Sequence, residues 1–257
     1  MRHKHTRGTS SIRLRYFLTI ILCAAFFGCA LFYTTKKPID TIYYVTGKVQ
    51  SDSLIVMLPG GGDEAADFMR NGFIRAVEDS GIHADIIAVD ANLGYYFKRN
   101  LLPRLHEDVI VPAREKGYKN IWLLGISMGG LGAMIYAKHH PDNISGLIVL
   151  APFLGYPAVI NEISDAGGLS RWTPKEPIDK DNYQHDLWKW LKGYAEPKEK
   201  RPRLVLGYGN KDKFGAGSAL LAEVLPRDQV FIVPGRHDWK TWGRIFDMIL
   251  RSGVIPS

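Results

Sequence analysis

Seven short runs rich in valine, isoleucine and leucine recur along residues 41–257, and longer stretches of helical composition separate them. Several runs are continuously apolar, which is typical of strands that helices cover on both faces. This alternation predicts an α/β fold with a mostly parallel, doubly wound sheet. The expected strands are Ile42–Val45, Leu54–Leu58, Asp85–Val89, Ile121–Leu124, Gly146–Leu150, Arg203–Leu206 and Val230–Val233. The expected helices are Ala65–Ser80, Lys98–Lys116, Met128–His140, Ala216–Leu225 and Trp239–Arg251.

The first 40 residues differ in charge from the rest of the chain. They hold seven of the 33 basic residues and one of the 26 acidic residues, so residues 41–257 are close to neutral. The body therefore gives no electrostatic reason to expect a nucleic-acid partner. Five basic residues precede an uncharged run of 18 residues, Tyr16–Tyr33, and this predicts a single transmembrane helix. The denser charge before it favours an extracytoplasmic body, either periplasmic or extracellular.

We interpret residues 1–40 as a cytoplasmic basic stub followed by an uncleaved signal-anchor, and residues 41–257 as one domain with a sizeable core. Gly28 and Cys29 faintly resemble a bacterial lipoprotein processing site, so cleavage or lipidation at Cys29 stays open. The other cysteine, Cys23, also lies in the apolar run. The body can therefore form no disulfide, zinc-thiolate site or thiol nucleophile.

A G-x-S-x-G motif, Gly125–Gly129, follows the fourth expected strand and opens the next expected helix. In this context a serine hydroxyl is held at the carboxyl end of the sheet, because small neighbours let strand and helix approach closely. Ser127 is therefore the candidate nucleophile. The amide of Met128, at the helix N-terminus, is a candidate oxyanion donor. The alternative is a glycine-rich turn with an incidental serine.

A serine nucleophile needs a base, and the base needs an acid that orients it. Asp212 and His237 each lie a few residues beyond a later expected strand, in the chain order serine, acid, histidine. The other histidines precede a strand, lie in helices, or lie in the insertion and the N-terminal segment. Asp238, next to His237, is expected to cap the last helix. The alternative is that Asp212 and His237 are ordinary loop residues.

A glycine-rich turn, Pro59–Asp63, follows the second expected strand. Such a turn can supply the second amide of an oxyanion hole, and Gly61 is the candidate donor. The same residues also match the dinucleotide fingerprint G-x-G-x-x-A. Asp63 and Glu64 oppose that interpretation, because they place carboxylates where a pyrophosphate would bind. No Walker motif and no cluster with metal-ligand spacing occurs, so neither metal nor cofactor is expected.

Residues 152–202 interrupt the alternation and are rich in proline, glycine, lysine, aspartate and aromatics. The stretch is too long for a tight loop, so it predicts a partly helical lid insertion, with a helix near Tyr183–Gly193. Trp172 and Trp188 from this insertion, with Tyr95 from an earlier loop, are the expected substrate-binding walls. Such walls favour an apolar acyl or aryl group. The alternative is that these aromatic side chains pack the lid onto the body.

Together these features resemble the α/β-hydrolase superfamily over essentially all of residues 41–257. Within it, the glycine-rich turn looks like the early loop of carboxylesterase and thioesterase relatives, although Pro59 stands where these often have histidine. The histidine loop, with Trp242, is similar to that of small esterases. The motifs that carry the resemblance are PGGGD (59–63), GISMGG (125–130), GNKD (209–212) and GRHDW (235–239).

The resemblance implies a serine hydrolase acting on a small-molecule carboxylic ester or thioester. Ser127, Asp212 and His237 would form its triad, the amides of Gly61 and Met128 its oxyanion hole, and no cofactor would be needed. Two other classes stay open: an acyltransferase with the same triad, and a non-catalytic binding protein on this fold. Ester cleavage is favoured over peptide cleavage because the chain offers no second domain to hold a polypeptide.

Overall fold

The computed structural model describes residues 34–47, 51–174, 182–195 and 201–255. Its centre is a seven-stranded sheet with the order β1-β3-β2-β4-β5-β6-β7. β1 is antiparallel to β3, and all other neighbours are parallel. The strands are β1 Thr41–Tyr44, β2 Ser53–Leu58, β3 Asp85–Val89, β4 Asn120–Ile126, β5 Gly146–Leu150, β6 Arg203–Gly209 and β7 Val230–Val233.

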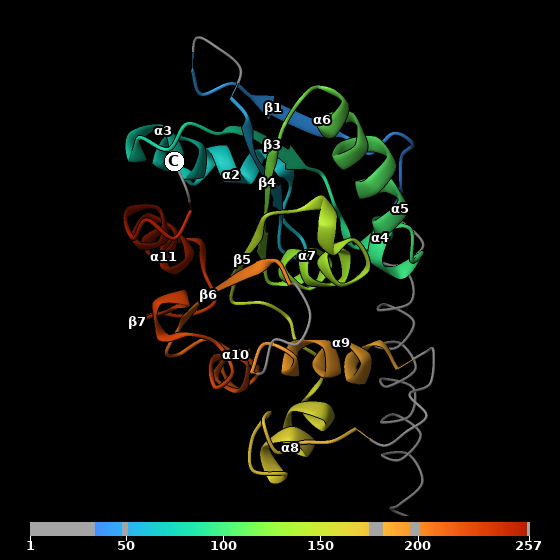
Figure 1. Cartoon of the computed structure of the whole chain (residues 1–257), viewed down its shortest axis with the longest axis vertical. Helices are drawn as coiled ribbons and strands as arrows, with labels where there is room; N and C mark the ends of the chain where they lie inside the picture. Colours follow the sequence, from blue (N-terminus) through green and yellow to red (C-terminus); the bar gives the residue numbers. More distant parts are fainter. Residues whose placement is uncertain (1–33, 48–50, 175–181, 196–200, 256–257) are drawn as a thin grey trace, which may run out of the picture.

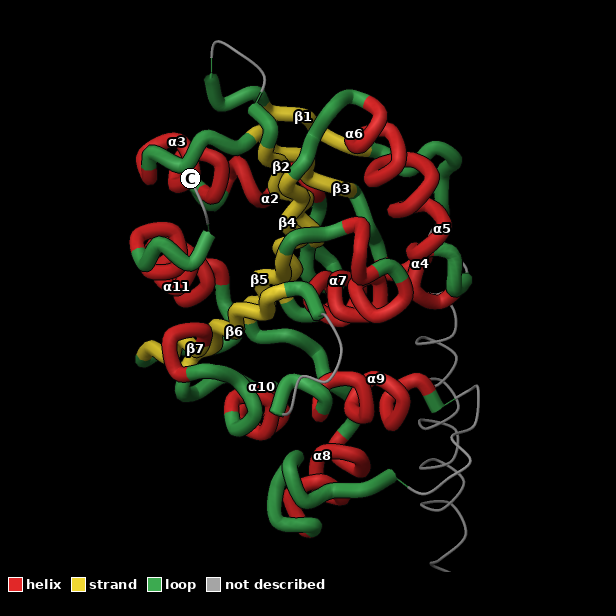
Figure 2. Tube along the Cα trace, viewed as in Figure 1, coloured by secondary structure: helices red, strands yellow, loops and turns green. Residues whose placement is uncertain are grey.

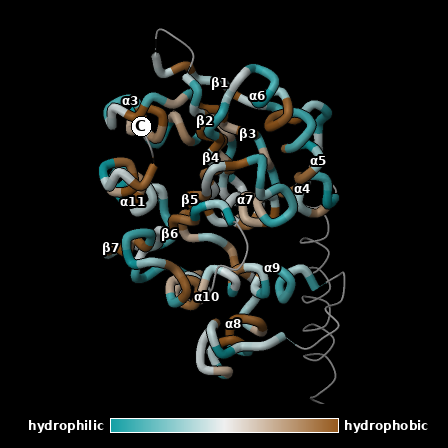
Figure 3. Tube along the Cα trace, viewed as in Figure 1, coloured by the Kyte–Doolittle hydropathy of each residue, from teal (hydrophilic) through white to brown (hydrophobic). Residues whose placement is uncertain are grey.

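Helices cover both faces of the sheet. They are α2 Ala65–Arg70, α3 Phe73–Ser80, α4 Leu93–Phe97, α5 Leu101–Leu105, α6 Val111–Glu115, α7 Met128–His139, α8 Pro157–Asp165, α9 Tyr183–Lys192, α10 Gly215–Ala222 and α11 Trp239–Arg251. Helices α3 and α11 pack together on one side, and α5, α6 and α7 lie on the other (Figures 1 and 2). The hydrophobic residues gather along the centre of the sheet (Figure 3). In β5 all five residues are buried, as expected of a strand covered on both faces.

The mostly parallel sheet predicted from the sequence is confirmed, and each expected strand is present. The predicted transmembrane helix falls on residues 1–33, which lie outside the described residues. Within the ranges that the structure describes, no helix is both long enough and apolar enough to span a bilayer.

Two expected helices are divided. The stretch 65–80 forms α2 and α3, because Gly72 between them takes a left-handed conformation with φ of 80°. The stretch 98–116 contains a π-helical turn, His106–Ile110, between α5 and α6. Pro112, in the first turn of α6, has no amide hydrogen and cannot continue the regular series of α-helical hydrogen bonds, which accounts for the π-helical turn.

The insertion contains two helices, α8 and α9, and its residues 175–181 and 196–200 lie outside the described residues. An ion pair of 2.7 Å between Lys138 and Asp186 joins α9 to α7. His185 of α9 lies 2.8 Å from a carboxylate oxygen of Glu162 in α8. The helix expected near Tyr183–Gly193 is thus confirmed as α9 and is attached to the body.

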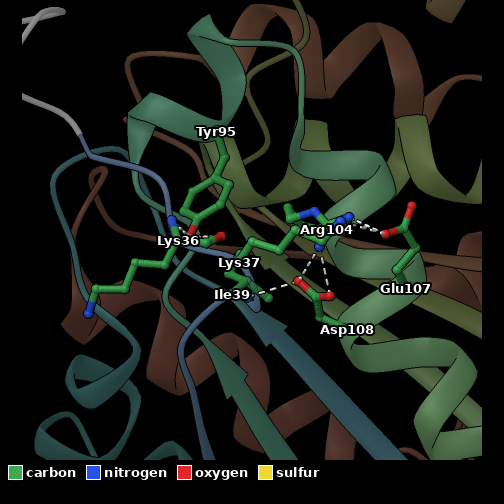
Figure 4. Close-up of polar contacts among 7 residues, drawn as sticks. All are labelled: Lys36, Lys37, Ile39, Tyr95, Arg104, Glu107 and Asp108. Atoms are coloured by element: carbon green, nitrogen blue, oxygen red, sulfur yellow. Dashed lines mark hydrogen bonds and ion pairs between the residues drawn. The ribbon is translucent and has the colours of Figure 1, made fainter.

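The residues before β1, Thr34–Asp40, form a strap that lies along α4 and the π-helical turn (Figure 4). The amide of Lys36 donates to the hydroxyl of Tyr95 at 2.8 Å, and the amide of Ile39 donates to Asp108 at 2.9 Å. The side chain of Ile39 is buried in the core. The strap therefore belongs to the folded domain.

Candidate active site

Ser127 lies at the sharp turn between β4 and α7, in a backbone conformation that side-chain-bearing residues rarely adopt (φ 53°, ψ −111°). Its glycine neighbours make the turn possible. A Cβ atom on Gly129 would lie 2.1 Å from the carbonyl oxygen of Leu58, and one on Gly125 would lie 2.3 Å from that of Gly129. The turn therefore needs small residues on both sides of the serine, as the G-x-S-x-G spacing predicted.

Two backbone hydrogen bonds hold Ser127 in place. Its amide donates to the carbonyl of Leu150 at the end of β5, at 2.9 Å. Its carbonyl accepts the amide of Phe153, the second residue of the insertion, also at 2.9 Å. The serine is thus tied to the neighbouring strand and to the start of the lid, which fixes the direction of its side chain.

The structure brings Ser127, His237 and Asp212 together. His237 Nε2 lies 3.1 Å from Ser127 Oγ. On the other side of the ring, Nδ1 lies 3.0 and 2.9 Å from the two carboxylate oxygens of Asp212. The Asp212 side chain is fully buried and that of His237 is nearly so. This arrangement can move a proton from the hydroxyl to the imidazole while the carboxylate orients the ring.

The loops that carry the acid and the histidine are joined to each other. The amide of Asn210 donates to the carbonyl of Val233, and the amide of Lys211 donates to that of Gly235, both at 2.9 Å. A Cβ atom on Gly209 would lie 2.5 Å from the Gly235 carbonyl oxygen, so glycine permits this close contact. The distance between Asp212 and His237 is therefore set by the backbone.

Two aromatic rings, those of Phe214 and Trp242, hold the imidazole on two sides, and the sequence analysis did not identify Phe214. Phe214 and Trp242 contact the His237 ring edge-to-face, with centroids 5.0 and 4.9 Å away. The amide of Phe214 also donates to Asp212 Oδ1 at 2.8 Å. The signal for Phe214 is its place two residues after the acid. Asp238 accepts the amide of Thr241 at 2.8 Å, which confirms its predicted role as the cap of α11.

The loop after β2 lies beside the nucleophile. A Cβ atom on Gly60 would be 3.7 Å from the Cβ of Ser127, and Gly61 is the next residue, exposed in the same loop. Met128 is the first residue of α7, and the first amides of a helix have no acceptor within it. Both proposed oxyanion donors therefore belong to segments that meet at Ser127.

The N-terminus of α2 is surrounded by carboxylates. The amide of its first residue, Ala65, donates to Asp90 at 3.3 Å. Glu64 and Asp67 form a reciprocal capping box at the same helix end. These acids disfavour a pyrophosphate and with it the dinucleotide interpretation. Among the described residues no group of three or more histidine, cysteine or acidic side chains could hold a metal ion.

The three aromatic side chains predicted to bind substrate are buried in the structure. Tyr95, Trp172 and Trp188 are only 2%, 2% and 0% exposed. The Tyr95 hydroxyl binds the strap, Trp172 Nε1 donates to Glu162 and Trp188 Nε1 donates to the Leu154 carbonyl, the last two at 2.8 Å. All three side chains are therefore packed within the protein with their polar atoms paired, and their role in substrate binding stays a prediction.

Comparisons with known proteins agree with the fold. The family described as serine aminopeptidase, S33, matches residues 105–208. Est1E from Butyrivibrio proteoclasticus aligns with 84% of this chain and 96% of its own, at 18% identity and a TM-score of 0.56. S-formylglutathione hydrolase (FrmB) from Staphylococcus aureus aligns with 85% of this chain and 98% of its own, at 15% identity and 0.54.

A monoacylglycerol lipase from Paleococcus ferrophilus aligns with 83% of this chain and 98% of its own, at 15% identity and a TM-score of 0.53. No curated protein matches the chain in sequence. The chain therefore has the fold of the α/β-hydrolase superfamily, the family that its motifs resemble. At these identities the likeness to the solved structures concerns the fold, and the chemistry has to be argued from the site.

Proposed function

We propose that this chain is a serine hydrolase that cleaves a small carboxylic ester or thioester through an acyl-enzyme on Ser127. The observation that carries the proposal is the continuous contact from Asp212 through His237 to Ser127, with each heavy-atom distance near 3 Å. Similarity in fold to a monoacylglycerol lipase and to an S-formylglutathione hydrolase supports ester chemistry. The match to a serine aminopeptidase family also supports a serine nucleophile.

In the first half-reaction, Ser127 Oγ attacks the substrate carbonyl while His237 Nε2 accepts the hydroxyl proton. The carbonyl oxygen takes up the electron pair, and the amides of Gly61 and Met128 stabilise its charge. The tetrahedral intermediate then collapses. The bond to the alcohol or thiol breaks, and His237 returns the proton to the leaving group.

In the second half-reaction, water takes the place of the alcohol. His237 removes one of its protons as the oxygen attacks the acyl carbon, and then returns a proton to Ser127 Oγ as the acid is released. Asp212 keeps the imidazole in one tautomer and stabilises its cationic form in both halves. An acyltransferase would differ only in the acceptor, so product analysis with alcohols and amines present separates the two.

The direct test is covalent labelling of the full chain in detergent with a fluorophosphonate probe, followed by peptide mass spectrometry. We expect an adduct on Ser127 that is lost in His237→Ala, because the imidazole activates the hydroxyl. The same preparations are assayed on short-chain esters. A folded wild type that neither labels nor turns over any ester would contradict the proposal and favour a binding protein.

We also propose that the apolar run Tyr16–Tyr33 anchors the chain in a membrane, with the body on the extracytoplasmic side. The charge bias of the sequence supports this topology. The strap supports close attachment, because residue 34 directly follows the run and the strap is hydrogen-bonded to the body. Protease added to spheroplasts, which lack an outer envelope barrier, should digest the body only if it lies outside the cytoplasmic membrane. Alkaline carbonate should leave the chain in the membrane fraction.

A further inference from the structure

The mechanism leaves one acidic side chain at the site without a role. Asp63 closes the glycine-rich loop after β2 and is partly buried. Its Oδ1 accepts a hydrogen bond of 3.3 Å from Nε1 of Trp239, the first residue of α11 and the second after His237. The carboxylate thus lies between the proposed oxyanion loop and the helix that follows the histidine.

The second carboxylate oxygen of Asp63, Oδ2, occupies the space in which a side chain at Gly60 would lie. A Cβ atom on Gly60 would lie 2.6 Å from Asp63 Oδ2 and 3.7 Å from the Cβ of Ser127. Any larger residue at position 60 would push the carboxylate aside. Glycine at this position therefore lets the acid fold toward the side of the nucleophile.

The charge of this carboxylate is not compensated by a basic side chain among the residues that the structure describes. Within the described part of the chain, no lysine or arginine forms an ion pair with Asp63. Burial raises the pKa of Asp63, and the neighbouring charge of Asp67 adds to the rise, while His237 and the bond from Trp239 oppose it. The other nearby acids are engaged: Asp212 with His237, and Asp67 with Arg70.

The bond to Trp239 does not by itself require a charged residue, because an amide oxygen can also accept it. A partly desolvated carboxylate gains most from a cationic partner, which recovers the free energy lost on burial. Among the described residues this position has no lysine or arginine partner. The substrate is then the group that can supply one.

We propose that Asp63 is a specificity-determining residue that binds a positively charged group of the substrate close to the scissile carbonyl. This inference rests on the proposed ester hydrolysis and names its substrate class: an ester that carries an ammonium group on its alcohol side or on its acyl side. The carboxylate contacts this group directly and takes no part in the proton transfers.

The test compares matched esters in the full chain. For the alcohol side, a choline ester is paired with the 3,3-dimethylbutyl ester of the same acid, in which carbon replaces the charged nitrogen. For the acyl side, an alanyl ester is paired with the isobutyryl ester of the same alcohol. The quantity measured is the ratio of kcat/KM for the cationic ester to that for its neutral partner.

In Asp63→Asn we expect this ratio to fall about 10- to 100-fold for one of the two pairs, because the variant loses the attraction between the carboxylate and the cation in a partly desolvated site. The pair that responds identifies the side that carries the charge. The matched control is Glu64→Gln, which removes the same charge from an exposed neighbour and should leave the ratio unchanged. In the wild type, tetramethylammonium should compete with the cationic ester, and tert-butanol should not.

Two results would overturn the inference. The first is that the ratio stays the same in Asp63→Asn for both pairs while the variant is still labelled at Ser127. This result would contradict the role of Asp63 and leave the proposed hydrolysis standing. The second is a wild type that turns over neither pair and takes no fluorophosphonate label, which removes the proposed function as well. A variant that does not fold is recognised by its lost labelling, and the tetramethylammonium experiment in the wild type then decides.

Discussion

His237 Nε2 lies 3.1 Å from Ser127 Oγ, although 110 residues separate the two in the chain. Parallel strands explain how they meet. β4, β6 and β7 lie in one sheet and their carboxyl ends point to the same edge, where Ser127, Asp212 and His237 follow one strand each. Ligand and catalytic sites of open α/β sheets lie at this edge. The contact is therefore a consequence of the topology.

The hydrogen bond between Asp212 and His237 should control the rate of ester hydrolysis. In Asp212→Asn the side chain keeps its volume but can hold the imidazole in the wrong tautomer, and we expect kcat to fall roughly 10⁴-fold. Ester turnover measures the loss, and circular dichroism checks the fold. The matched control is Asp238→Asn, because asparagine caps a helix as well as aspartate does and this side chain points away to Thr241. Equal losses in the two variants would contradict the assigned roles.

The turn at Ser127 should tolerate no side chain at position 129. In Gly129→Ala the new methyl group would meet the carbonyl of Leu58 at 2.1 Å, so the helix or the strand must shift. We expect lost labelling at Ser127 and a lower melting temperature. Gly243→Ala is the control, because nothing lies within 4 Å of its added atom and alanine favours the interior of α11 by about 1 kcal/mol. A fully active Gly129→Ala variant would refute the requirement for glycine at position 129.

The sheet and the meeting of Ser127, Asp212 and His237 could be predicted because each rests on a local pattern. Apolar runs identify strands, and loops after parallel strands meet at one edge. The surroundings of the site could not be predicted in the same way. Composition shows that residues 152–202 are rich in aromatic side chains, and the packing of helices alone decides which way each ring points. Trp172 and Trp188 accordingly proved to be buried.

Local propensity explains the remaining differences in the helices. The sequence predicts a single helix over 65–80, yet Gly72 takes a positive φ and divides it. The short helix α4 lies in what was expected to be a loop, where the side chain of Asn92 accepts the amide of Gly94 at 2.8 Å. Asparagine caps helices and also forms turns, so its presence in the sequence does not separate the two.

Tyr95→Phe should affect stability and leave substrate binding unchanged. The hydroxyl accepts the Lys36 amide at 2.8 Å and lies in the buried contact between strap and body. Its removal leaves that amide without this partner and should lower the free energy of unfolding by about 1 kcal/mol. Chemical denaturation measures the change. A raised KM with unchanged stability would instead restore the substrate-binding role expected from the sequence.

The ion pair between Arg104 and Asp108, whose carboxylate also accepts the Ile39 amide of the strap, should contribute more to stability than the neighbouring pair of Arg104 with Glu107. Arg104 bonds both oxygens of Asp108, at 2.8 and 3.0 Å, and also contacts Glu107 (Figure 4). The side chains of Arg104 and Asp108 are 8% and 10% exposed, whereas that of Glu107 is 53% exposed. Asp108→Asn removes the buried partner of Arg104, leaves the guanidinium only the exposed Glu107, and should destabilise the fold by about 3 kcal/mol.

The control for Asp108→Asn is Glu107→Gln, which removes the exposed carboxylate that contacts the same Arg104 guanidinium. We expect a loss below about 1 kcal/mol. Melting curves of the two variants, recorded at one salt concentration, provide the comparison. Similar losses in both would show that burial does not set the strength of this pair.

The substrate preference proposed for Asp63 should depend on pH in a defined direction. Only the ionised carboxylate attracts a cation, so the preference is complete above the pKa of Asp63 and is lost as the pH falls through it. Burial and the charge of Asp67 raise that pKa above the usual 3.8, against the opposing effect of His237. The loss should therefore begin at a higher pH than for an ordinary aspartate. The ratio of kcat/KM for each cationic ester to that for its neutral partner measures this loss, because any effect of pH on the chemical step that both esters share cancels in the ratio. The ratio should be independent of pH in Asp63→Asn, and a pH-independent ratio in the wild type would contradict the role of this carboxylate.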